Sequence, residues 1–207
     1  MSSQTTAEPA AEPRRRPSRL VWVAVVVAIV VAVGLVVRQL THDEKPPYTD
    51  PASSGLLTLC DTRGHEITSG KITDKPLAPI VLGSTALDSR VEAGVQGLAT
   101  LYGYQPRAGV EAEEFSGSPI GGPVPFKDHT RPATRVVKAG YSIKDFTTIY
   151  PANDDGFVQL RLILSADGLG VDTDSYDTAD LKVTGDTWHV VRGGNASCSD
   201  AAARLAD

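Results

Sequence analysis

The stretch Phe-Val-Gln-Leu-Arg-Leu-Ile-Leu, residues 157–164, carries the clearest structural signal in the chain. Its apolar residues recur at every second position and alternate with Gln159, Arg161 and Ile163, the apolar set being Val158, Leu160, Leu162 and Leu164. A period of two is typical of a β-strand that buries one face. We therefore predict a strand over this stretch and expect the polar positions to face away from the core.

The sequence that follows predicts two more strands paired with the first. Residues 179–183 form a second candidate strand, and Gly185-Asp186 supplies a two-residue hairpin turn into residues 187–191. In this register Trp188 and Val190 lie on the same face of the sheet as the apolar residues of the stretch 157–164. Three consecutive antiparallel strands are the expected result.

Upstream, short apolar runs separated by turn residues predict further strands over residues 56–60, 65–72, 79–82 and 97–104. Residues 105–132 are rich in proline and glycine, and they predict an irregular surface loop. Ser142 and Asp145 resemble a capping box that opens a short helix, which Pro151 ends. The fold class predicted is mainly β or α+β, an antiparallel sandwich-like or curled sheet with one short helix.

The chain holds two cysteines, Cys60 and Cys198, near the two ends of the predicted domain. A single disulfide between them is the favoured interpretation, because such bonds persist outside the cytoplasm. Two free buried thiols or a redox pair are the alternatives, although no Cys-x-x-Cys motif is present.

An apolar run of 18 residues, Leu20 to Val37, predicts a transmembrane helix preceding the β-rich domain. Four arginines lie before the run and Arg38 follows it, so the N-terminus is expected in the cytoplasm and the rest outside. A cleaved signal peptide is the alternative, but the run exceeds the usual length and no small-x-small site follows it.

These features divide the chain into five parts. The predicted boundaries are a disordered cytoplasmic segment 1–19, a transmembrane helix 20–37, a linker 38–55, an extracytoplasmic β-rich domain 56–200 and a C-terminal tail 201–207. The linker assignment rests on its prolines, serines and glycine. Localisation at the plasma membrane follows from this division.

Three alanines of the span, Ala24, Ala28 and Ala32, recur every four residues and share one helix face. Small residues at this spacing let a second helix approach closely, so a homodimer is one interpretation. Packing of a valine-rich helix against the lipid bilayer alone is the other.

The charge of the outer part excludes one class of partner. Residues 39–207 contain 15 basic and 23 acidic side chains, and an acidic surface argues against binding to nucleic acid. Five aspartates crowd residues 167–180, and Asp172, Asp174 and Asp177 are a weak candidate for a calcium site. The spacing lacks the glycine and the distant glutamate of an EF-hand, and aspartate is common in turns.

No catalytic or cofactor motif stands out, so no cofactor is expected and enzymatic activity stays an open question. The four histidines are scattered, and no Gly-x-Ser-x-Gly elbow or His-Glu-x-x-His pair occurs. A catalytic group assembled in space from distant residues is not excluded by sequence.

Several segments, among them Leu59-Cys60-Asp61, Tyr150-Pro151, residues 156–161 and residues 183–188, resemble single-pass membrane proteins of GC-rich bacteria with a β-rich extracytoplasmic domain. The resemblance implies a bacterial cell membrane as the location. It carries no named activity, so it assigns no catalytic residue.

The function expected is a membrane-anchored binding or assembly module of the bacterial cell envelope, acting on a protein partner or a small ligand. Tyr102, Tyr104 and Phe115 flank the proline- and glycine-rich loop and are candidates for an exposed recognition surface. Alternatively, these aromatic side chains complete the core. The rival functions are an extracytoplasmic hydrolase and a carrier of a small ligand inside the curled sheet.

Overall fold

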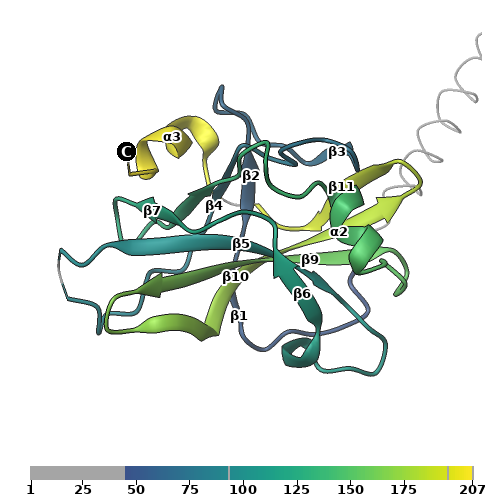
Figure 1. Cartoon of the computed structure of the whole chain (residues 1–207), viewed down its shortest axis with the longest axis horizontal. Coiled ribbons are helices and arrows are strands. Elements are labelled where there is room, and N and C mark those ends of the chain that lie inside the picture. The colour runs from purple at the N-terminus through teal and green to yellow at the C-terminus, as the bar shows by residue number, and fades with distance from the viewer. Residues whose placement is uncertain (1–44, 93, 195, 207) are drawn as a thin grey trace, which may run out of the picture. The chain divides into compact units, whose positions relative to one another are not determined.

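The computed structural model describes residues 45–92, 94–194 and 196–206 (Figure 1). The chain divides into residues 1–44 and 45–207, and all that follows concerns the second unit. The predicted cytoplasmic segment, the span 20–37 and its alanine face lie outside the described residues. Among the helices that are described, none has the length and apolar character needed to cross a bilayer.

A large sheet of eight strands forms most of the described unit. Its main path runs through β3 (Ser69–Lys71), β11 (Thr187–Arg192), β10 (Gly170–Thr184), β9 (Phe157–Ala166), β5 (Gly97–Gln105) and β6 (Ser116–Pro119). Two strands attach beside this path: β7 (Val124–Phe126) pairs with β5, and β1 (Ser53–Leu56) pairs in parallel with β10. The prediction of a mainly β, antiparallel fold is confirmed.

The three strands predicted from the C-terminal sequence pair as expected. β9, β10 and β11 are antiparallel neighbours, and Leu160 faces Ala179 across the first pair. Gly185 takes a positive φ of 57° in the tight turn, a conformation that glycine adopts without strain. β10 begins at Gly170, well before the predicted start at residue 179, because its first half pairs with the end of β9 despite its polar sequence.

A second sheet of three short strands packs on the large one. It consists of β2 (Thr58–Cys60), β4 (Ile80–Leu82) and β8 (Ala133–Arg135). Leu59 and Val81 join the main core with residues of β5, β9 and β10, and the Thr134 hydroxyl donates to the Ala99 carbonyl of β5 at 2.9 Å. The space between the two sheets is therefore filled by side chains, as in a sandwich.

The opposite face of the small sheet carries a second apolar cluster. Cys60, Ile80, Leu82 and Ala133 pack there against the C-terminal residues Cys198, Ala201 and Leu205. These belong to a 3₁₀ turn, η2 (Cys198–Asp200), and a short helix, α3 (Ala201–Arg204). The residues expected to form a tail are thus in part helical and buried, and α3 is a helix beyond the single one predicted.

The predicted helix is present as α2 (Ile143–Ile149). The Ser142 hydroxyl accepts a hydrogen bond from the Asp145 amide at 3.1 Å, and the Asp145 carboxylate accepts one from the Ser142 amide at 2.9 Å. Both halves of the capping box are present. Phe146 packs directly over Gly103 of β5, where a β-carbon would lie only 2.9 Å from its ring.

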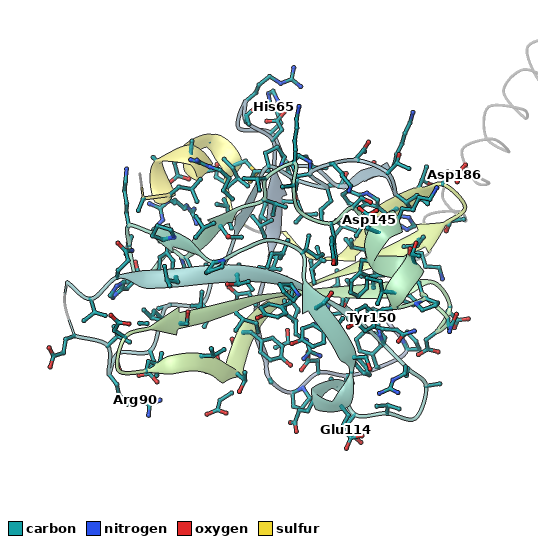
Figure 2. All side chains as sticks on the ribbon, in the orientation of Figure 1. His65, Arg90, Glu114, Asp145, Tyr150 and Asp186 are labelled. Carbon is teal, nitrogen blue, oxygen red and sulfur yellow. A yellow bond between two sulfur atoms is a disulfide. The ribbon has the colours of Figure 1, made fainter. Side chains whose placement is uncertain are left out.

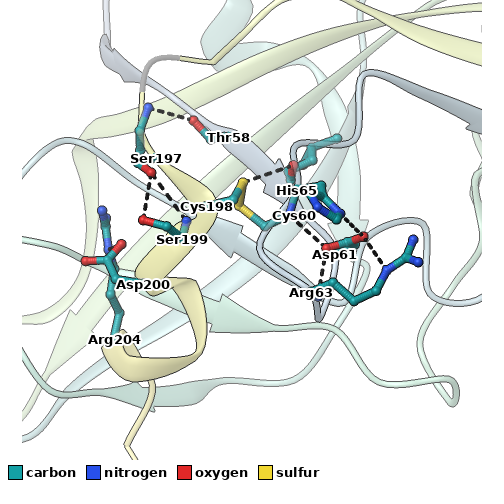
Figure 3. The surroundings of a disulfide bond; sticks show 12 residues. Thr58, Cys60, Asp61, Arg63, His65, Ser197, Cys198, Ser199, Asp200 and Arg204 are labelled. Atoms are coloured by element: carbon teal, nitrogen blue, oxygen red, sulfur yellow. Dashed lines mark hydrogen bonds and ion pairs between the residues drawn. A yellow bond between two sulfur atoms is a disulfide. The ribbon is translucent and has the colours of Figure 1, made fainter.

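The predicted disulfide between Cys60 and Cys198 is formed (Figure 3). It joins β2 to η2 across 138 residues, with a Cα–Cα distance of 5.6 Å. A turn at residues 61–65 lies beside it, in which the Asp61 carboxylate accepts from the amides of Arg63 and His65 at 2.8 Å each. The two ends of the β-rich region are therefore linked covalently.

The N-terminal boundary differs from the expected one. The sequence predicts a linker through residue 55, but β1 begins at Ser53 and residues 45–52 already contact the sheet. Proline, serine and glycine gave this segment the composition of a linker, yet Tyr48 and Asp50 have partners on the sheet. We call residues 45–52 the N-terminal strap.

The predicted surface loop at residues 105–132 also contains regular structure. It holds a 3₁₀ turn, η1 (Ala112–Glu114), followed by β6 and β7. Together, the strap and η1 lie against the side of the large sheet that faces away from the main core.

Candidate functional site on the outer face of the large sheet

The outer face of the large sheet, which points away from the main core, carries polar residues at its centre. Gln159 and Arg161 of β9 lie on this face opposite Asp180 and Thr178 of β10. The alternating sequence predicts that these positions are exposed. Instead, Gln159 is 0% exposed and Arg161 is 3% exposed, so β9 is buried on both faces.

The guanidinium group of Arg161 lies between aromatic rings. Its Cζ atom is 4.0 Å from the centroid of Tyr104 on β5 and 4.6 Å from that of Tyr176 on β10. Arg161 also donates from Nε to Gln159 at 2.6 Å and from a terminal nitrogen to the Ala112 carbonyl of η1 at 2.7 Å. Stacking and hydrogen bonds of this kind hold an arginine side chain in one geometry.

Asp50 of the strap supplies the negative charge that this arginine needs. Its Oδ2 atom is 3.6 Å from Arg161, and the two side chains are 0% and 4% exposed. The Tyr176 hydroxyl and the Ala52 amide both donate to the other carboxylate oxygen, at 3.1 and 3.2 Å. The strap is therefore attached to the sheet through a buried ion pair.

Tyr48 provides a second attachment of the strap to the sheet. Its hydroxyl donates to Asp180 at 2.6 Å, and its ring lies edge-on to Phe115 at a centroid distance of 5.2 Å. Asp180 also accepts from Arg192 at 2.5 Å. These contacts therefore pair two carboxylates, Asp50 and Asp180, with two guanidinium groups, Arg161 and Arg192.

Burial shapes the chemistry of the two tyrosines that bind these carboxylates. Burial, together with the nearby Asp180 charge, raises the pKa of Tyr48 far above its usual value. Burial likewise raises the pKa of Tyr176, although the Arg161 charge opposes this change. Both hydroxyls accordingly stay protonated and act as hydrogen-bond donors.

Two buried polar atoms of this cluster have no hydrogen-bond partner in the structure: Oδ2 of Asp50 and Nε2 of Gln159. The first is held by charge alone, since it faces Arg161. Unsatisfied buried polar atoms cost about 1–3 kcal/mol each, so natural proteins keep few of them. Two of the five such atoms among the described residues lie beside Arg161.

A cavity of about 420 Å³ opens beside Arg161. It is lined by Ala52, Tyr104, Glu113, Arg161, Ile163, Thr173, Asp174 and Tyr176. The strap, η1 and the strands β5, β9 and β10 all contribute to its walls. Figure 2 labels Glu114, the neighbour of Glu113 on η1. The cavity has the size of a small-molecule site.

The structure places the three predicted recognition residues on this face. Phe115 is 5% exposed and packs on Tyr48, so the prediction that it is exposed is wrong, while Tyr104 is half-buried and lines the cavity. Tyr102 is also half-buried and stacks on Tyr104 at a centroid distance of 6.2 Å. Sequence reasoning named these aromatic residues but missed Arg161, Asp50 and Tyr48. Each of these is a single charged or aromatic residue, and no motif in the surrounding sequence sets it apart.

The three aspartates considered for a calcium site make different contacts. Asp177 is 2% exposed, and its carboxylate accepts four hydrogen bonds from the amides and hydroxyls of Ser84 and Thr85. Asp172 accepts from the amide of Asp174, and Asp174 lines the cavity. Across the described ranges, no three His, Cys, Asp or Glu residues are grouped so as to hold a metal ion.

A second hollow, of about 550 Å³, lies at the edge of the large sheet. It contains Ser69 of β3 and His189 of β11, which are direct cross-strand partners, and Lys71 and Asp74 beside them. Partners of this kind have β-carbons about 4.5–5.5 Å apart. In this hollow the structure brings Ser69 and His189 side by side.

The described unit is a mainly β domain with a disulfide between its ends and a charged, aromatic cluster on the outer face of its large sheet. No protein-family model, curated protein or solved structure matches this chain.

Proposed function

We propose that the protein is a membrane-anchored, extracytoplasmic binding or assembly module of the bacterial cell envelope. Residues 20–37 anchor it in the plasma membrane, the N-terminus lies in the cytoplasm, and the β-rich domain lies outside. The outer face of the large sheet, with the cavity beside Arg161, is the surface that contacts its partner or ligand.

The observation that carries this proposal is the attachment of the strap. Tyr48 and Asp50 fix the chain to the centre of the sheet, and only ten residues, 38–47, separate Tyr48 from the end of the predicted span at Val37. Ten residues extend to roughly 36 Å at most, compared with roughly 65 Å at most for a free linker through residue 55. A connection this short supports a module that is tethered to its proposed anchor.

The disulfide supports the compartment. Cys60 and Cys198 are 0% and 6% exposed, so their bond is structural, and structural disulfides are typical of proteins outside the cytoplasm.

Protease added to intact cells tests the topology. With an epitope at the N-terminus, we expect the β-rich domain to be digested while a short tagged fragment stays in the membrane fraction. A full-length band that resists protease until the cells are permeabilised would place the domain on the cytoplasmic side and contradict the proposal.

Site-specific photo-crosslinking tests the contact surface. A crosslinking amino acid at Glu113, on the cavity rim, is expected to capture a partner in intact cells. The same group at Glu66, an exposed residue outside the cavity lining, is the matched control. Equal yields from both positions would show that this face is not the contact surface.

An extracytoplasmic hydrolase is the second candidate, favoured by the pairing of Ser69 with His189 in the edge hollow. A histidine next to a serine can act as the base that activates a hydroxyl nucleophile. A fluorophosphonate probe should then label the wild-type protein and the Ser89→Ala control, whose serine is exposed and outside this hollow, but not the Ser69→Ala variant. Absence of labelling in the wild type removes this candidate.

A further inference from the structure

The exposed apolar side chains of the domain are concentrated in one short stretch. Among the described residues four large apolar side chains are exposed, and three of them are Val137, Tyr141 and Ile149. Ile149 ends α2, and Tyr141 lies just before the residue that caps the helix. Val137 begins the preceding turn, in which its carbonyl accepts from the Gly140 amide at 2.9 Å. Because a helix rises about 1.5 Å per residue, Tyr141 and Ile149 lie roughly 15 Å apart.

The same stretch carries positive charge in a domain that is acidic overall. Residues 129–153 contain four basic residues and one acidic residue, Asp145. The Asp145 carboxylate is already paired with Lys75 at 2.6 Å. Lys138 and Lys144 are exposed, and within the described part of the chain neither has an ion-pair partner. Both charges are therefore available to an anionic surface.

The α2 helix presents this combination on its outer side. Ile143 and Phe146 are buried toward the core, while Lys144, Thr148 and Ile149 are exposed. Apolar and tyrosine side chains enter the boundary between lipid headgroups and acyl chains, and lysines beside them attract anionic headgroups. Exposed apolar groups together with unpaired lysines are therefore typical of a surface that contacts a lipid bilayer.

The chain enters the domain beside this helix. Pro46 and Tyr48 of the strap line one hollow together with Asp154, which lies in the loop that follows α2. Seven residues, 38–44, separate the end of the predicted span from Lys45, and they extend to roughly 25 Å at most. The end of α2 is thus near the point from which the chain leaves for the proposed anchor.

We propose that α2 and the turn before it dock on the lipid bilayer, with anionic phospholipid headgroups as the ligand. The docking surface, which we call the α2 face, consists of Val137, Lys138, Tyr141, Lys144 and Ile149. This inference deepens the proposed function and rests on it, because the anchor holds the α2 face near the bilayer. So few side chains bind a membrane weakly by themselves, but a tether makes the contact intramolecular and raises its effective concentration.

Docking through the α2 face gives the domain a fixed orientation. Phe146 of α2 packs over Gly103 of β5, which pairs with Leu160, a residue of the main core. The helix therefore lies on the core-facing side of the large sheet. The cavity beside Arg161 lies on the other side of that sheet, so it stays open to a partner while the domain is docked.

Fluorescence quenching by lipid tests the contact in the full-length protein in nanodiscs. A bimane dye is attached at Thr148→Cys, on the α2 face side of the helix, and nitroxide-labelled headgroups are the quencher. The comparison dye is at Asp167→Cys, exposed in the hairpin at the far end of the ten-residue strand β9.

In nanodiscs of equal parts phosphatidylglycerol and phosphatidylcholine, we expect strong quenching at Thr148→Cys and little at Asp167→Cys. Phosphatidylcholine alone, or 1 M NaCl, should weaken the quenching at Thr148→Cys, because attraction to headgroups is lost or screened. Absence of quenching there, or equal quenching at both positions, would overturn the inference.

Variants in the Thr148→Cys protein test which side chains dock. Lys138→Gln, Lys144→Gln and Ile149→Ser are each expected to lower the ratio of docked to undocked protein about fivefold. Lys127→Gln and Val171→Ser change an exposed lysine and the fourth exposed apolar residue outside the α2 face, and should dock like the parent. Equal quenching in all five variants would show that the α2 face is not the contact and would overturn the assignment.

The outcomes separate the two proposals. A domain found on the cytoplasmic side by protease in cells would contradict the proposed function, yet the nanodisc experiment would still show whether the α2 face contacts lipid. An extracytoplasmic domain that captures partners through Glu113, but whose Thr148→Cys dye is never quenched, would retain the proposed function and remove the docking.

Discussion

Arg161 and Asp50 form the buried pair on which the outer face depends. Removing one partner of such a pair leaves the other charge buried and uncompensated, which costs about 3–5 kcal/mol. Stacking on Tyr104 and Tyr176 and two further hydrogen bonds remain for Arg161, so the lower end of this range applies.

We therefore expect Asp50→Ala to lower the free energy of unfolding by about 3 kcal/mol, measured by urea denaturation followed by circular dichroism. Asp167→Ala, at an exposed hairpin position, is the matched control and should change it by less than about 0.5 kcal/mol. An Asp50→Ala protein as stable as this control would show that the strap is not held by the ion pair.

Sequence reasoning could not find this pair. Polar residues at alternate positions of a strand normally face water, so Gln159 and Arg161 indicated an exposed face. The groups that cover them come from far along the chain: Tyr48 and its acceptor Asp180 are 132 residues apart. Burial of this kind is decided by tertiary contacts, and no local pattern records it.

The α2 helix shows what a short local pattern can determine. Its seven residues begin at a capping box, where the Ser142 hydroxyl satisfies an otherwise unpaired amide of the first turn. Replacing an N-cap serine by alanine costs about 1 kcal/mol. Thr148, near the end of the same helix, is exposed and donates only to the Lys144 carbonyl.

We expect Ser142→Ala to lower the unfolding free energy by about 1 kcal/mol and Thr148→Ala to change it by a few tenths at most, as read from chemical denaturation. A loss in the Thr148 variant equal to that of Ser142→Ala would mean that the cap contributes nothing specific.

The same box predicts a pH dependence. Hydrogen bonds from Lys75 and from Ser142 hold the pKa of Asp145 at about 2, below its usual 3.8. A carboxyl group whose pKa is lower in the folded chain than in the unfolded chain stabilises the fold at pH values above its unfolded-state pKa. This stabilisation is lost as the pH falls from about 4 through 2.

Titration of the Asp145 carboxyl by NMR should therefore show a midpoint near 2 in the wild type and a higher midpoint in Ser142→Ala, which removes one donor. A midpoint near 3.8 in the folded wild-type protein would contradict the hydrogen-bonded geometry.

At this scale the sequence was a good guide where elements are long and regular. The strands at 97–105 and 157–166, the final hairpin and the α2 helix follow from periodicity, turn residues and a cap. The short strands β6, β7 and β8 span three or four residues, and β6 and β7 both contain proline. Pairing with neighbours, and not propensity, makes them strands, so their sequences gave no signal.

The disulfide acts on the whole described unit, because it closes a loop of 138 residues between β2 and η2. Bonds that close long loops stabilise proteins by roughly 2–5 kcal/mol. Both cysteines lie in the second apolar cluster, which holds α3 against the small sheet.

The double variant Cys60→Ala/Cys198→Ala should lose about 2–5 kcal/mol of unfolding free energy. Hydrogen exchange should be fastest relative to the wild type in residues 201–206, whose attachment depends on this cluster. Unchanged protection of these residues would show that α3 is held by its apolar contacts alone.

The strap also decides where the domain can be cut without harm. A fragment beginning at Leu56, where composition alone would start the domain, lacks Tyr48 and Asp50, so Arg161 loses its buried carboxylate and Asp180 loses one of its donors. Shedding by a protease that cuts within residues 51–56 would thus release a frayed, aggregation-prone product. A cut before Lys45 would release a domain that keeps Tyr48 and Asp50 in their contacts with the sheet.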